Sequence, residues 1–228
     1  MIVLVVDTST PAATAAIAEL GGAGREPVLL AERVTVDAQR HGEVLAPSME
    51  AVLSEAAVPL GGLTAVVAGV GPGPFTGLRI GLVSAAALAD AFGLPAYGVC
   101  SLDAIAHPIR HPAGPVLVVT DARRHEVYWA TYAVDGARIS GPSVSRPADV
   151  PTDGCVLACG AGAAQYAESF GLPVSGPSYP SALALAALAA DRVTGGAPSE
   201  ALSPLYLRRP DAVERAAAKT HLPLVGPR

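Results

Sequence analysis

The sequence predicts an α/β protein built as two lobes that share one plan. Both halves of the chain begin with an apolar strand that ends in aspartate, at Asp7 and at Asp121, and then turns into a second strand. A glycine-rich loop at residues 69–81 joins an apolar strand directly to an apolar helix, as in α/β units. A proline-rich stretch separates the halves, so we expect domains at residues 1–107 and 108–228, with the last helix packing back on the first lobe.

The first half alternates short apolar runs with longer amphipathic ones. Its expected strands are residues 2–6, 14–20, 28–36, 64–68 and 96–100. Its expected helices are residues 41–57, 78–92 and 102–106. In the second half, we expect strands at residues 116–121 and 126–134 and near 155–159, and helices at residues 162–170, 181–193 and 211–219. The second half therefore repeats the strand–turn–strand opening of the first.

Composition restricts the class of protein. The chain has 228 residues, of which 51% are hydrophobic, and a formal net charge of −5 with a pI near 5.5. An acidic protein does not grip nucleic acid unaided, so any RNA contact needs a basic partner. No apolar run reaches the roughly 18 to 20 residues of a membrane span. The three cysteines lie in apolar stretches, which fits a reduced cytoplasmic setting.

The glycine-rich loop leads into a helix N-terminus, whose free N–H groups suit a phosphate. Two common phosphate fingerprints are absent, because Thr76 stands at the third glycine of the dinucleotide motif and Leu78 follows Gly77 where a Walker loop has lysine. Backbone and hydroxyl groups must then hold any nucleotide. The residues expected near a phosphate are Asp7, Thr8, Ser9, Thr10, Gly71, Gly73, Thr76, Gly77 and Arg79.

Four segments carry a resemblance to a known family. They are Asp7-Thr8-Ser9-Thr10, the loop from Gly71 to Gly81, the run Asp121-Ala122-Arg123-Arg124-His125-Glu126-Val127-Tyr128, and Pro204-Leu205-Tyr206-Leu207-Arg208. Together they resemble the bacterial TsaB family over nearly the whole chain. The resemblance implies an actin-like fold (ASKHA, ribonuclease H-like) of two lobes with mixed sheets flanked by helices, the second lobe reduced. It also implies a cytoplasmic subunit of the machinery that places threonylcarbamoyl on adenosine beside the tRNA anticodon.

The resemblance further implies that the subunit is non-catalytic. The related transferase TsaD holds a metal with two histidines, and Ser101 and Ile105 stand at those positions here, where isoleucine offers no lone pair. We therefore expect no catalytic residue and no metal ligand. His107 and His111 have the spacing of a helical metal pair, but proline follows each of them and disfavours that helix.

The implied partner is TsaD, docked on the first-lobe helices at 41–57 and 78–92. The expected interface residues are His41, Val44, Leu45, Met49, Leu78, Gly81, Leu82, Ala85 and Ala89. TsaE, a homodimer through the same surface when TsaD is absent, and tRNA within the assembled complex are further expected partners, with no membrane contact. No cofactor of its own is expected, although ATP or ADP at the interface with TsaD fits the loop. The arginines expected to meet tRNA phosphate are Arg79, Arg123, Arg124, Arg208 and Arg209.

Two other classes remain open from the residues. One is an enzyme, either an actin-like small-molecule kinase with Asp7 serving magnesium or a glycoprotease-like peptidase, although neither His-Glu-x-x-His nor Gly-x-Ser-x-Gly occurs. The other is a dimeric interaction module without a role in tRNA. ATP turnover by the isolated chain would indicate the kinase. Normal threonylcarbamoyladenosine levels in the tRNA of a strain depleted of this protein would indicate the interaction module.

Overall fold

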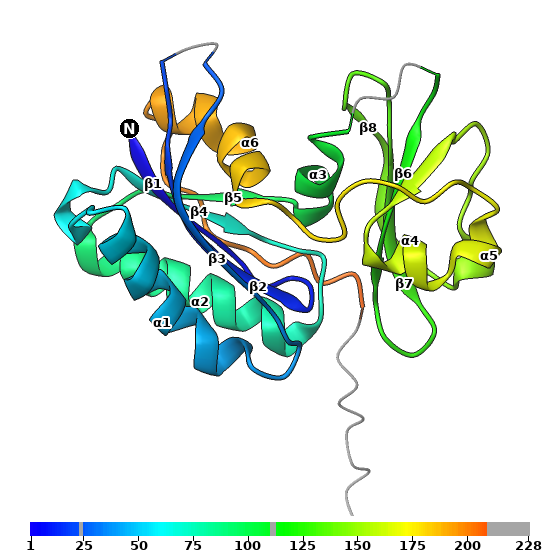
Figure 1. Ribbon diagram of the computed structural model, residues 1–228, viewed down its shortest axis with the longest axis horizontal. Helices are drawn as coiled ribbons and strands as arrows, with labels where there is room; N and C mark the ends of the chain where they lie inside the picture. Colours follow the sequence, from blue (N-terminus) through cyan, green and yellow to red (C-terminus); the bar gives the residue numbers. More distant parts are fainter. Residues whose placement is uncertain (23–24, 110–112, 209–228) are drawn as a thin grey trace, which may run out of the picture.

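The computed structural model describes residues 1–22, 25–109 and 113–208. It shows two lobes side by side, each built on one mixed sheet (Figure 1). The lobe I sheet has the order β3-β2-β1-β4-β5, and the lobe II sheet has the order β8-β7-β6-β9. Lobe I contains β1 (Ile2–Asp7), β2 (Ala12–Glu19), β3 (Val28–Val36), β4 (Ala65–Gly69) and β5 (Ala96–Val99). Lobe II contains β6 (Val116–Asp121), β7 (Val127–Tyr132), β8 (Arg138–Ser145) and β9 (Leu157–Cys159).

Strand β1 lies at the centre of lobe I, antiparallel to β2 and parallel to β4. It is a continuous apolar run because both of its faces are buried. Val3 and Val5 face one layer of the core and Leu4 and Val6 face the other. This central strand therefore places Asp7, its last residue, at the edge of the sheet between the lobes.

Three helices cover the lobe I sheet. Helices α1 (His41–Glu55) and α2 (Phe75–Phe92) lie on one face, and α6 (Ala182–Thr194) lies on the other (Figure 1). A short 3₁₀ turn, η1 (Leu60–Gly62), precedes β4. Helix α2 is long and apolar enough to pass a test for a membrane span by length and composition, but it packs on β4, β1 and α1.

Lobe II takes a helix from the first half of the chain. Helix α3 (Ser101–Ala106) packs its Leu102 and Ile105 against β6 and β7. Helix α4 (Ala161–Gln165) packs on β6 and β9. Helix α5 (Ala167–Phe170) packs on the 3₁₀ turn η2 (Pro147–Asp149). The lobes thus exchange helices across the expected boundary at residue 107, because α3 completes lobe II and α6 completes lobe I.

The structure agrees with most expected elements to within a few residues, and the main differences are the following. Helix α2 begins at Phe75 rather than Leu78, because Pro74 has extended geometry and serves as its N-cap. Strand β8 was not expected, because its sequence is half exposed and contains Gly141-Pro142, which edge strands tolerate. The expected helix at residues 162–170 is two short helices, broken at Tyr166. The expected helix at residues 211–219 lies outside the described residues.

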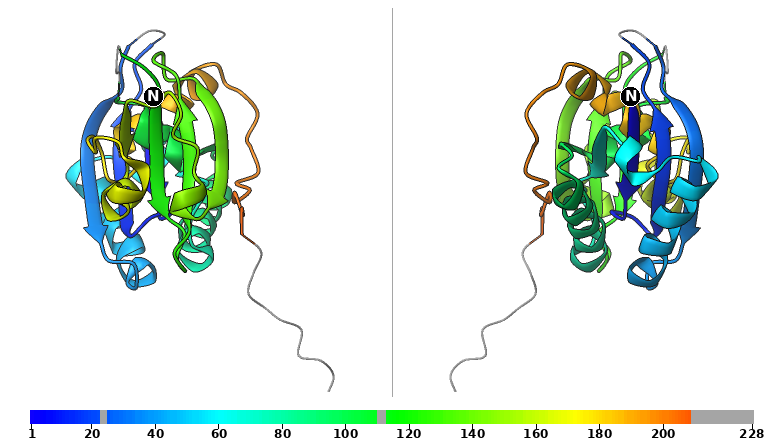
Figure 2. Two further views of the ribbon diagram at one scale, coloured as in Figure 1. Left: turned by 90° about the vertical axis from the view of Figure 1, so that its right-hand side faces the viewer. Right: turned by 90° about the vertical axis from the view of Figure 1, so that its left-hand side faces the viewer.

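Residues 197–208 form an extended segment that we call the interlobe strap. Its Glu200 donates its backbone N–H to the carbonyl of Ala96 in β5 (2.8 Å), and Leu205 donates to the carbonyl of Val70 (2.9 Å). Figure 2 shows it running down one side of the molecule. The strap ends at Arg208, whose guanidinium donates to the carbonyl of Ala122 in lobe II (3.0 Å). It therefore begins on lobe I and ends on lobe II.

Candidate functional site

Asp7 is buried beneath a network of hydroxyl groups. Its Oδ1 accepts hydrogen bonds from the backbone N–H and the hydroxyl of Ser9 (2.9 and 2.8 Å), and its Oδ2 accepts one from the Ser101 hydroxyl (2.6 Å). The side chain is 1% exposed. Burial raises the pKa of Asp7, while hydrogen bonds from Ser101 and Ser9 act to lower it. A Cβ at residue 69 would lie 1.7 Å from Oδ2, so Gly69 is required beside it. Asp7 is consequently a structural anchor between β1 and α3.

Thr8 joins the first turn to helix α2. Its hydroxyl donates to the carbonyl of Gly77 (2.7 Å) and accepts from the N–H of Gly81 (3.0 Å). These are the two groups that a regular α-helix pairs with each other, so the hydroxyl bridges one step of the helical ladder. A Cβ at residue 81 would lie 2.3 Å from this oxygen. The glycine at residue 81 therefore admits Thr8 of the same chain.

The glycine-rich loop is held by the same network. The N–H of Gly71 donates to the Ser101 hydroxyl (3.2 Å), and its carbonyl accepts from the Ser101 N–H (2.8 Å). The carbonyl of Gly73 lies 3.4 Å from the hydroxyl of Tyr128 in lobe II. The loop is thus fixed between α3 and the second lobe.

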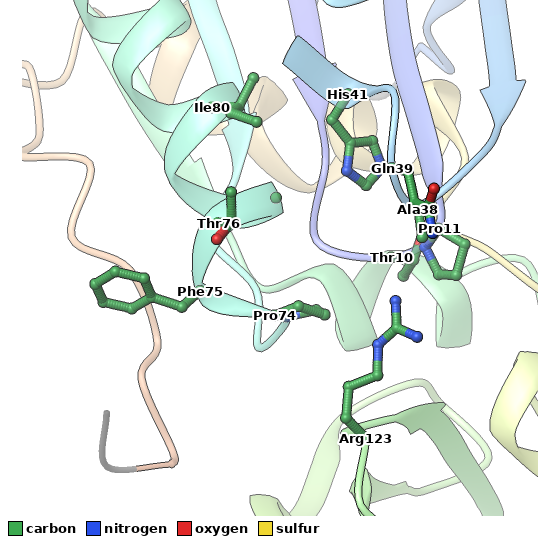
Figure 3. Close-up of a pocket in the computed structure, with 11 residues that line it drawn as sticks. Thr10, Pro11, Ala38, Gln39, His41, Pro74, Phe75, Thr76, Ile80 and Arg123 are labelled. Carbon is green, nitrogen blue, oxygen red and sulfur yellow. The ribbon is translucent and has the colours of Figure 1, made fainter. Parts of the chain in front are cut away.

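A cleft of ≈ 300 Å³ opens beside this anchor, between the first turn, the N-termini of α1 and α2, and the β6–β7 turn (Figure 3). Figure 3 shows the His41 ring and the Arg123 guanidinium pointing into the same space from opposite sides. The lining residues are Thr10, Pro11, Ala38, Gln39, His41, Pro74, Phe75, Thr76, Gly77, Ile80 and Arg123.

The polar groups of the cleft suit an anion. Helix α2 has no side-chain cap, and its first donor to a backbone carbonyl is Leu78 N–H. Among the described residues, the amides of Phe75, Thr76 and Gly77 have no partner and are available to a ligand. Arg123 supplies a guanidinium beside them. His41 is 5% exposed and its Nε2 has no hydrogen-bond partner among the described residues. That nitrogen has almost no accessible surface, so it does not face the cleft, and the polar groups that face the cleft are those of α2 and Arg123.

The structure changes the expected set of phosphate-proximal residues. Thr10, Thr76 and Gly77 do line the cleft. Asp7, Thr8 and Ser9 are buried, and their polar groups are engaged within the chain. Two cleft residues were assigned other roles in the sequence analysis: His41 a partner contact and Arg123 a tRNA contact.

Arg79 was expected near the phosphate and lies elsewhere. Its guanidinium stacks 3.7 Å over the Phe75 ring, and its Nε donates to the Tyr206 hydroxyl (2.9 Å). The two rings also stack, with centroids 5.0 Å apart. Arg79 is therefore tied to the interlobe strap on the outside of α2.

Most of the expected interface side chains are buried in this chain. The buried ones are His41, Leu45, Met49, Leu78, Gly81, Leu82, Ala85 and Ala89, leaving Val44 half-buried. Apolar residues at helical spacing mark the face of a helix that packs on its own sheet. The outward face of α2 instead presents Val83, Ala86 and Ala87, and Val83 is 65% exposed.

The two positions that were expected to correspond to metal-binding histidines make structural contacts within the chain. The Ser101 hydroxyl holds Asp7, and Ile105 is fully buried against lobe II. Among the described residues, no group of three His, Cys, Asp or Glu side chains is close enough to hold a metal ion. Of the alternative pair, His107 ends α3, and His111 lies outside the described residues.

Comparison with known proteins places this geometry in a family. Residues 29–190 match the family model described as TsaD, tRNA N6-adenosine threonylcarbamoyltransferase. The chain belongs to the TsaD family. Within that family, it is similar to TsaB of Bacillus subtilis, with 34% identity over 58% of this chain and 55% of that protein. It is 53% identical to the uncharacterised protein Rv3421c of Mycobacterium tuberculosis, over 92% of this chain and 93% of that protein.

A solved structure of similar sequence has the same fold. YeaZ from Pseudomonas aeruginosa superposes with a TM-score of 0.75 at 29% identity, covering 90% of this chain and 99% of that one. The chain spans about half the length of other curated relatives that it matches, such as 56% of ML0378 from Mycobacterium leprae. The expected actin-like architecture of two mixed sheets flanked by helices is confirmed.

Proposed function

We propose that this chain is a non-catalytic subunit in the biosynthesis of threonylcarbamoyladenosine in tRNA, and that it acts by holding and activating the TsaD transferase. The observation that carries the proposal is the buried Asp7–Ser101 network. Its carboxylate and hydroxyl groups are buried and bonded to one another between the lobes, which leaves them engaged within the chain, and the relatives named TsaB are named for this biosynthesis. A cytoplasmic location follows from a tRNA substrate.

The proposed docking face is the outward side of α2 with its neighbour α1. Val83, Ala86 and Ala87 are exposed there, and Ala46 of α1 is exposed as well. Small side chains allow a partner helix to approach closely, and a row of them on an exposed helix is suited to helix packing. TsaD is the proposed occupant, and a second copy of this chain takes the same face when TsaD is absent.

Val83→Glu tests this face. A carboxylate buried at an apolar helix interface is costly, so the affinity for TsaD is expected to fall at least about tenfold. Val134→Glu is the matched control, because Val134 is an exposed valine that follows β7 in lobe II. Affinity is measured by titration calorimetry, and tRNA modification is measured in a mixture with TsaD, TsaE and donor. Equal affinities for Val83→Glu and Val134→Glu would contradict the proposed face.

The cleft beside α2 is the proposed site for the phosphates of ATP or ADP at the interface with TsaD. The N-terminal amides of α2 and the Arg123 guanidinium support this assignment. TsaE and tRNA are proposed to join this assembled complex rather than the isolated chain.

Arg123→Gln tests the nucleotide proposal. Loss of one guanidinium contact to phosphate is expected to weaken ADP binding to the complex with TsaD by about tenfold or more. Arg40→Gln removes the same charge one residue from His41, at a side chain that does not line the cleft, and is the control. Unchanged ADP affinity in Arg123→Gln, with the complex intact, would refute the proposed contact.

A further inference from the structure

The turn that carries Arg123 is strained. Three consecutive residues, Arg123, Arg124 and His125, have left-handed backbone geometry with φ of 64°, 53° and 60°. None of them is glycine, and a side chain makes this backbone conformation unfavourable. A turn of this kind persists only where its surroundings fix it.

Hydrogen bonds within the turn supply part of that support. The N–H of Ala122 donates to the carbonyl of Glu126 (2.9 Å), and the N–H of Glu126 donates to the carbonyl of Arg123 (3.0 Å). The N–H of Arg123 donates to the Asp121 carboxylate (3.1 Å). These bonds close the turn but do not attach it to lobe I.

Arg208 attaches it. One guanidinium nitrogen donates to the carbonyl of Ala122 (3.0 Å), and the other lies 3.3 Å from the carboxylate of Glu126. Ala122 and Glu126 are the two ends of the turn, so one rigid fork spans its base. The Arg208 side chain is 26% exposed and that of Glu126 is 34% exposed, which makes this pair less hydrated than an ordinary surface pair.

The strap that carries Arg208 is itself anchored to lobe I. Glu200 bonds to β5 through its own N–H and accepts hydrogen bonds from Arg192 (2.7 and 2.8 Å) and from the N–H of Gly98 (3.1 Å). Tyr206 stacks on Phe75, two residues from Arg208. The position of Arg208 is therefore set by β5 and by the first turn of α2.

We propose that Arg208 is a positioning residue which, through the interlobe strap, holds the strained β6–β7 turn and thereby fixes Arg123 opposite the N-terminus of α2. The strap is a latch between the lobes that sets the width of the cleft in the free chain. This inference concerns the chain alone and holds whatever the cleft binds.

Amide hydrogen exchange on the full chain, resolved by NMR, tests the latch. Arg208→Met is expected to speed exchange of the Ala122 and Glu126 amides by roughly tenfold, because the turn loses its contacts with Arg208. Val118 and Ala130, central in β6 and β7, are expected to keep their rates. Arg146→Met is the control, since Arg146 is an exposed arginine of the same lobe.

Arg208→Lys distinguishes positioning from general stability. Lysine keeps the charge beside Glu126 but lacks the fork, so its turn amides are expected to exchange at rates between those of the native chain and Arg208→Met. Should Arg208→Met fail to fold, this variant alone decides. Unchanged turn amides in a folded Arg208 variant would overturn the proposal, as would equal acceleration at Val118 and Ala130.

Discussion

Replacing Gly81 with alanine is expected to break the link between the first turn and α2. The new Cβ would lie 2.3 Å from the Thr8 oxygen, closer than real Cβ contacts. Thr8 cannot simply retreat, because its hydroxyl also donates to the carbonyl of Gly77 at 2.7 Å. The perturbation therefore forces apart two elements that share a buried hydrogen bond.

The magnitude follows from three opposing contributions. Overpacking costs about 1–3 kcal/mol, and two lost hydrogen bonds cost about 0.5–1.5 kcal/mol each. Alanine regains about 1 kcal/mol of helix propensity over glycine. Gly81→Ala is thus expected to lower the free energy of unfolding by about 3 kcal/mol, or Tm by about 9 °C for a domain of this size. Thr8→Ala is expected to cost about 1–2 kcal/mol.

The double variant Thr8→Ala/Gly81→Ala is the decisive measurement. Without the hydroxyl, the helix pairs the carbonyl of Gly77 with the N–H of residue 81, so the double variant is expected to cost no more than Thr8→Ala alone. Urea unfolding followed by circular dichroism gives each free energy. Gly61→Ala, at an exposed glycine with nothing within 4 Å of the added Cβ, is the control. Additive losses in the double variant would refute the bridging role of Thr8.

Three further outcomes follow from titratable groups. Burial raises the pKa of Asp7 in the folded chain above 3.8, so the free energy of unfolding is expected to fall as pH rises from 3.8 through the folded pKa. Urea unfolding at a series of pH values measures this fall, and Asp7→Asn is expected to remove it. Burial acts to raise the pKa of Glu200, but the hydrogen bonds from Arg192 outweigh it and hold this pKa below 4.5. The Arg192–Glu200 pair therefore stabilises the fold above pH 4.5, and its contribution is lost as pH falls through the folded pKa. Arg192→Met is expected to flatten that part of the pH profile of the free energy of unfolding. Burial raises the pKa of Cys159 to about 12, so a thiol reagent at pH 8 is expected to modify the half-buried Cys155 much faster than Cys159 in the folded chain. Equal rates of modification in the folded chain would contradict this order.

The sequence predicted secondary structure well where a local pattern of apolar residues is typical of a single element. The strand at 28–36 and the strand at 116–121 have the expected bounds, because continuous or alternating apolar residues bounded by turns have few alternatives. Strand β8 was not predicted, because it lies at the edge of its sheet and its sequence has no apolar face. Its pairing with β7 is made by backbone groups, which leave no trace in side-chain composition.

The site was harder to predict because it is made of long-range contacts. The sequence indicated a phosphate at the first turn and the glycine loop, yet only Thr10, Thr76 and Gly77 of that set face the cleft. His41 reaches the cleft because α1 begins beside α2, a placement that no local spacing encodes. Small residues at Gly77 and Gly81 indicated close approach correctly, but the approaching group is Thr8 of the same chain.

The exchange of α3 and α6 between the lobes constrains how the chain acquires its structure during synthesis. One face of the first sheet, including Val3, Val67 and Tyr97, is covered by α6, which leaves the ribosome long after β5. A nascent chain that ends before α6 exposes this apolar face and must wait for sequence-distant contacts to close it. The lobes therefore cannot fold one after the other. A fragment that ends at residue 107 would lack α6, the helix that shields one apolar face of its sheet from water.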